Sequence, residues 1–96
     1  MSEEKYVGLD VHQSTTVAAV HDEHGRSVME SIVETDARAI RDLLGGLRGR
    51  VHVTFEEGTQ AAWLYEVIRP MVAEVIVCDP RRNKLMGDGN KADKTT

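Results

Sequence analysis

Apolar and polar residues alternate along the first third of the chain with a period of two, which is typical of β-strands. We expect three strands here, over residues 6–11, 15–20 and 27–33. Between the second and the third lies Asp22-Glu23-His24-Gly25, a stretch of turn-forming residues in which Gly25 can adopt a positive φ. The pattern therefore predicts an antiparallel meander at the start of the chain.

The spacing of apolar residues then changes to that of an α-helix, with one face formed by Ala37, Ile40, Leu44 and Leu47. Either Thr35 or Asp36 can cap this helix, because a short side-chain oxygen accepts the unpaired N–H groups of the first turn. We expect a strand over residues 51–55, a second helix over about residues 59–69, and a short, buried apolar strand over residues 75–78 that includes the Cys78 thiol. From residue 79 onward we expect a helical stretch, a loop at residues 87–89, and a flexible tail from about residue 86.

The resulting element order is βββαβαβ, which predicts an α/β fold with a mixed five-stranded sheet and flanking helices. Right-handed crossovers place the first strand centrally, with the fourth strand beside it and parallel to it. The chain has 96 residues, of which 41% are apolar, so it fits one globular domain over residues 1–96.

Two acidic residues come at the ends of strands that we expect to be neighbours, Asp10 on the first strand and Glu56 after the fourth. Both would then emerge at one edge of the sheet, where open α/β sheets usually place their sites. Close carboxylates repel unless a divalent cation joins them, and Mg²⁺ or Mn²⁺ prefers such oxygen ligands. Asp93 can close the site from the C-terminal segment. The alternative is that Asp10 and Glu56 merely begin turns.

Five motifs occur in an order that resembles a known family: Tyr6-Val7-Gly8-Leu9-Asp10-Val11-His12, Phe55-Glu56-Glu57-Gly58-Thr59, Trp63-Leu64-Tyr65, Asp79-Pro80 and Lys91-Ala92-Asp93-Lys94. Together they resemble the N-terminal domain of the DEDD transposases of bacterial insertion sequences, which include the Piv-type DNA invertases. The resemblance covers nearly the whole chain. It implies a RuvC-like, RNase H-like fold in which four acids hold Mg²⁺ or Mn²⁺. The implied activity is cleavage and strand transfer of DNA phosphodiesters in transposition or recombination.

The resemblance implies particular roles for the acids of this chain. Asp10 is the first acid, Glu56 the second and Asp93 the third, and these three are the candidate catalytic and metal-binding residues. Glu57 is a rival for the second role. Strand alternation, however, puts Glu56 on the face that carries the even-numbered residues of its strand.

The fourth acid of the family would fall at position 96, where this chain has Thr96, and a hydroxyl is a poor ligand for a hard dication. The family also carries a C-terminal domain with a nucleophilic serine, which this sequence does not contain. We therefore expect a truncated domain that is inactive as a fragment. Whether such a fragment is an enzyme stays open at this point.

The charge of the chain bears on which partners it can bind. The net charge of −4 disfavours non-specific nucleic-acid binding by the whole domain, although five basic residues crowd the last sixteen positions: Arg81, Arg82, Lys84, Lys91 and Lys94. The family implies DNA as the partner, and a guide RNA as a further partner of a full-length protein. No segment has the length of a membrane span or the pattern of a signal peptide, so we expect a cytoplasmic protein.

Two other functions stay open. An acid at the end of a first strand also occurs in actin-like and sugar-kinase nucleotide-binding domains. Their phosphate-gripping hairpin, however, needs Gly and Ser or Thr where this chain has Val11-His12-Gln13. The second alternative is a non-catalytic remnant that dimerises or docks on DNA, as a possible homo-oligomer. His12 lies near the proposed site and can touch a phosphate, or it is an ordinary surface-loop histidine.

Overall fold

The computed structural model describes residues 3–79. These residues form β1 (Glu4–Val11), β2 (Thr15–Asp22), β3 (Ser27–Glu34), α1 (Ala37–Gly45), β4 (Arg50–Glu56), α2 (Ala61–Ile68), the short 3-10 helix η1 (Arg69–Met71) and β5 (Glu74–Cys78). The predicted order βββαβαβ is confirmed. The helical stretch, loop and flexible tail predicted after residue 79 lie outside the described residues.

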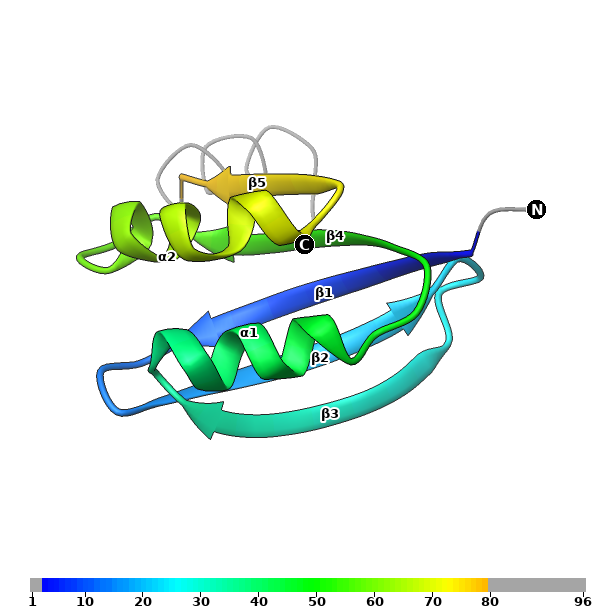
Figure 1. Cartoon of the computed structure of the whole chain (residues 1–96), viewed down its shortest axis with the longest axis horizontal. Helices are drawn as coiled ribbons and strands as arrows, with labels where there is room; N and C mark the ends of the chain where they lie inside the picture. The colour runs from blue at the N-terminus through cyan, green and yellow to red at the C-terminus, as the bar shows by residue number, and fades with distance from the viewer. Residues whose placement is uncertain (1–2, 80–96) are drawn as a thin grey trace, which may run out of the picture.

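The five strands form one mixed sheet in the order β3-β2-β1-β4-β5 (Figure 1). β1 pairs antiparallel with β2 and parallel with β4, and β4 pairs parallel with β5. The prediction that the first strand is central and has the fourth strand beside it is therefore confirmed. This mixed five-stranded sheet with flanking helices is the architecture that the sequence predicted, and its strand order is the one expected for an RNase H-like fold.

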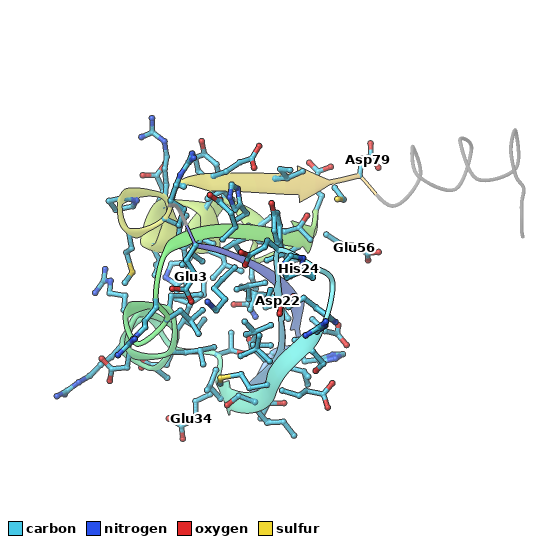
Figure 2. The ribbon with its side chains drawn as sticks, turned by 90° about the vertical axis from the view of Figure 1, so that its right-hand side faces the viewer. Glu3, Asp22, His24, Glu34, Glu56 and Asp79 are labelled. Carbon is cyan, nitrogen blue, oxygen red and sulfur yellow. The ribbon has the colours of Figure 1, made fainter. Side chains whose placement is uncertain are left out.

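Both helices lie on the same face of the sheet, and this face carries the core (Figures 1 and 2). The core combines alternate residues of the strands with the apolar faces of α1 and α2: Val7, Leu9, Ala18, Val20, Ile40, Leu44, Val51, Val53, Phe55, Leu64, Val67 and Ile68. Within residues 3–79, no helix covers the opposite face, which we call the open face. No helix in this range has the length and apolarity needed to cross a membrane.

The loops follow the predicted chemistry. Asp36 rather than Thr35 caps α1, because its Oδ2 accepts a hydrogen bond of 3.1 Å from the N–H of Ala39. In the turn between β2 and β3, Gly25 adopts the predicted positive φ of 79°. The Oδ1 of Asp22 accepts backbone N–H groups within this turn, which lowers the pKa of the Asp22 carboxyl.

β5 differs from the prediction in its exposure. Its parallel pairing is as expected, but among the described residues the strand lies at the edge of the sheet and has one neighbour. Ile76 is consequently 48% exposed and Val77 38% exposed, and Cys78 is partly exposed rather than buried. An uninterrupted apolar run therefore did not indicate burial here, because that pattern cannot distinguish an edge strand from an interior one.

Candidate metal centre

The structure brings Asp10 and Glu56 to the same edge of the sheet. In the parallel pairing of β1 with β4, Leu9 lies opposite Phe55, so the two acids occupy the next position along neighbouring strands. Leu9 and Phe55 point into the core, and alternation turns Asp10 and Glu56 to the open face. Figure 2 shows Glu56 on the side of the sheet away from the helices. The predicted convergence of these two acids is thus present.

A pocket of about 190 Å³ lies at this edge, and Asp10, Glu56 and Glu57 all contribute to its lining. The loop from β4 to α2 forms the rest of its polar wall. The N–H of Glu57 donates a hydrogen bond of 2.7 Å to the carbonyl of Cys78, which fixes the start of this loop against β5. Both glutamates therefore reach the pocket, but only Glu56 belongs to the strand that runs beside Asp10.

The chemistry of these donors fits a hard divalent cation. Carboxylate oxygens are preferred ligands of Mg²⁺ and Mn²⁺, and Asp10 and Glu56 are both exposed enough to accept a hydrated ion. Residues 3–79 contain no cluster of three or more potential metal-binding side chains. The described residues thus supply two of the three predicted acids, and Asp93 lies outside the described range.

A second polar cluster lies on the open face, at the other end of the same strands. The Nε2 atom of His52 is 2.6 Å from Glu4 Oε1, and its Nδ1 atom is 2.8 Å from Glu74 Oε1. The Tyr6 ring stacks on the imidazole with centroids 4.8 Å apart. Hydrogen bonding to Glu4 and, next, to Glu74 raises the pKa of His52. This cluster joins β1, β4 and β5.

Sequence reasoning assigned no role to His52. Its partners Glu4 and Glu74 are 48 and 22 residues away in the chain, so no local motif links them. The signal lies in the strand register, since His52 pairs with Tyr6 on one side and with Glu74 on the other. A register derived from the predicted parallel strands would have placed these side chains together.

Comparisons with known proteins add little to this geometry. No protein-family model matches the chain, and no curated protein matches it. Among solved structures, the chain is similar to LC11-RNase H1, which was determined in complex with an RNA/DNA hybrid. The two are 14% identical, the match covers 91% of each chain, and the TM-score is 0.40.

Proposed function

We propose that this chain is the metal-binding domain of a DEDD-type transposase, a class of protein that cleaves and joins the phosphodiester backbone of DNA, and that the fragment alone is inactive. The observation that carries the proposal is the placement of Asp10 and Glu56 side by side on parallel strands, at the rim of one polar pocket. Structural acids that only begin turns have no need to share a pocket. The order of motifs along the chain supports the transposase assignment within the wider RNase H-like fold.

In this proposal Asp10, Glu56 and Asp93 hold Mg²⁺ or Mn²⁺. When bound, such an ion stabilises the charge that develops on the phosphate during cleavage and strand transfer. The part played by the chain is to position the carboxylates: β1 and β4 hold the first two, and Asp93, which lies outside the described residues, is the proposed third. DNA is the proposed substrate, because the motifs resemble DNA transposases.

Calorimetric titration with Mn²⁺ tests the metal site. We expect the wild-type chain to bind the ion, and both Asp10→Asn and Glu56→Gln to abolish binding, because each replaces a charged ligand with a neutral amide of similar size. Glu57→Gln decides between the two adjacent glutamates and should leave binding unchanged. Glu30→Gln is the matched control, since Glu30 is an exposed glutamate of the same sheet, on β3.

Two results would contradict the proposal. Binding that survives in both Asp10→Asn and Glu56→Gln would place the ion elsewhere, and loss of binding in Glu30→Gln would show that only the overall charge matters. Where the wild-type chain binds Mn²⁺, an assay of branched-DNA cleavage with Asp10→Asn as the control tests the further expectation that this fragment alone is inactive.

A second candidate function is a non-catalytic association module, and the open face favours it. Tyr6 and Ile76, which are 45% and 48% exposed, line one pocket of about 250 Å³ on this face. Apolar side chains grouped in this way can mark an interaction surface, whereas Ile32 lies on β3 at the opposite edge of the sheet. Sedimentation velocity over a range of concentrations tests it. Self-association that Ile76→Lys abolishes supports this function, and a monomer at every concentration contradicts it.

A further inference from the structure

The candidate metal ligand Asp10 has a histidine beside it. His12 directly follows β1, and its Nε2 atom is 3.3 Å from Asp10 Oδ2. Residues two apart in an extended chain project to the same side, so the strand itself brings the two side chains together. Within residues 3–79, His12 is the one polar side chain in contact with the Asp10 carboxylate.

The backbone of His12 is fixed from two directions. Its N–H donates a hydrogen bond of 2.9 Å to the carbonyl of Thr15, which closes the turn between β1 and β2. Its carbonyl accepts a hydrogen bond of 2.6 Å from the hydroxyl of Thr35, which lies between β3 and α1. This turn is therefore held to a second part of the fold.

A buried threonine anchors this arrangement to the core. The Oγ1 atom of Thr16 is 2.9 Å from Oγ1 of Thr35, and Thr16 is fully buried. Because the Thr35 hydroxyl donates to His12, the Thr16 hydroxyl must donate to Thr35. The hydroxyl chain thus runs from the interior to the residue that contacts Asp10. These bonds involve main-chain atoms of His12, so they fix the position from which its side chain projects toward Asp10.

We propose that His12 is a positioning residue for Asp10, a role that rests on the proposed metal site. The imidazole lies against Oδ2 of the carboxylate and holds the Asp10 side chain in one rotamer, in which it would be held ready for a cation. Neighbours that orient a metal-binding side chain typically change metal affinity by about 10- to 100-fold. Because the His12 and Asp10 side chains are 62% and 73% exposed, we expect the lower end of that range.

The first test needs no metal. Three-bond couplings between Hα and the two Hβ atoms of Asp10 report its rotamer, and NMR can measure them in the full chain. We expect one rotamer in the wild type, averaged couplings in His12→Ala, and partial recovery in His12→Gln, which keeps an N–H donor. His24→Ala, in the turn between β2 and β3, should leave the Asp10 couplings unchanged. Averaged couplings in the wild type, or couplings that His12→Ala leaves unchanged, would overturn the proposal.

The second test measures the consequence for the ion. His12→Ala should weaken Mn²⁺ binding about tenfold, at the lower end of the usual range for orienting neighbours, without shifting the thermal unfolding midpoint. Unaltered affinity in His12→Ala would contradict the functional part of the proposal. If the wild type binds no Mn²⁺, the proposed function and this consequence both fail, and the coupling result still decides whether His12 positions Asp10.

Discussion

His52 has an unusual environment for a histidine on the surface of a sheet. Carboxylates from the two neighbouring strands contact both of its ring nitrogens, and the stacked Tyr6 ring covers one face of the imidazole. Only 16% of the His52 side chain remains exposed. Such an arrangement favours the protonated imidazole, because both nitrogens can then donate to carboxylate oxygens.

The raised pKa of His52 predicts that the stability of the fold depends on pH. A group whose pKa is higher in the folded state contributes stability that is fully present below its unfolded pKa, about 6.5 for histidine. That contribution is lost as the pH rises through the folded pKa. Urea unfolding should therefore show that His52→Gln flattens the decline in stability from weakly acidic to alkaline pH.

His24 serves as the matched control for this prediction. It lies exposed in the turn between β2 and β3, outside the His52 cluster, so His24→Ala should keep the pH dependence of the wild type. An identical pH dependence in the wild type and in His52→Gln would show that the two carboxylates do not stabilise the charged imidazole.

At the scale of elements, the connection from α1 to β4 sets how β4 lies against β1. Gly49 precedes β4 with a φ of 86°, and the N–H of Arg50 donates a hydrogen bond of 2.7 Å to the carbonyl of Glu3. A Cβ atom on Gly49 would overlap that same carbonyl. This close approach of the two backbones sets the register between β1 and β4. The same register places Asp10 beside Glu56.

Gly49→Ala should therefore destabilise the fold more than Gly25→Ala does. Both glycines have a positive φ, but a Cβ atom on Gly25 meets nothing within 4 Å. The strained φ alone costs about 1–2 kcal/mol for a residue other than glycine, and Gly49→Ala adds the overlap with Glu3. Chemical denaturation of both variants measures the difference, and equal losses would show that the approach of the backbones is not tight.

The element order and the positions of the two acids could be predicted because both depend on local patterns. Alternating residues identified the strands, and the short loops with right-handed crossovers restricted the order of the sheet. The exposure of β5 could not be predicted, because an apolar run indicates a strand without indicating its neighbours. The His52 cluster was missed for a related reason: it exists only once the register joins residues from three strands.

For the whole molecule, the position of the acids within the sheet has a consequence for fluctuations. Within residues 3–79, β2, β1 and β4 each have neighbours on both sides, whereas β3 and β5 are edges. Segments bonded on both sides usually open only when the whole domain unfolds, while edges open locally at lower free energy. Amide hydrogen exchange should therefore be slowest in β1, β2 and β4 and faster in β3 and β5.

Exchange in β1 as fast as in β3 would contradict this expectation. If it holds, Asp10 and Glu56 belong to strands that open only with the whole domain. The distance between the two strands then stays the same when an edge strand opens locally. The pair of acids would then persist for as long as the domain stays folded.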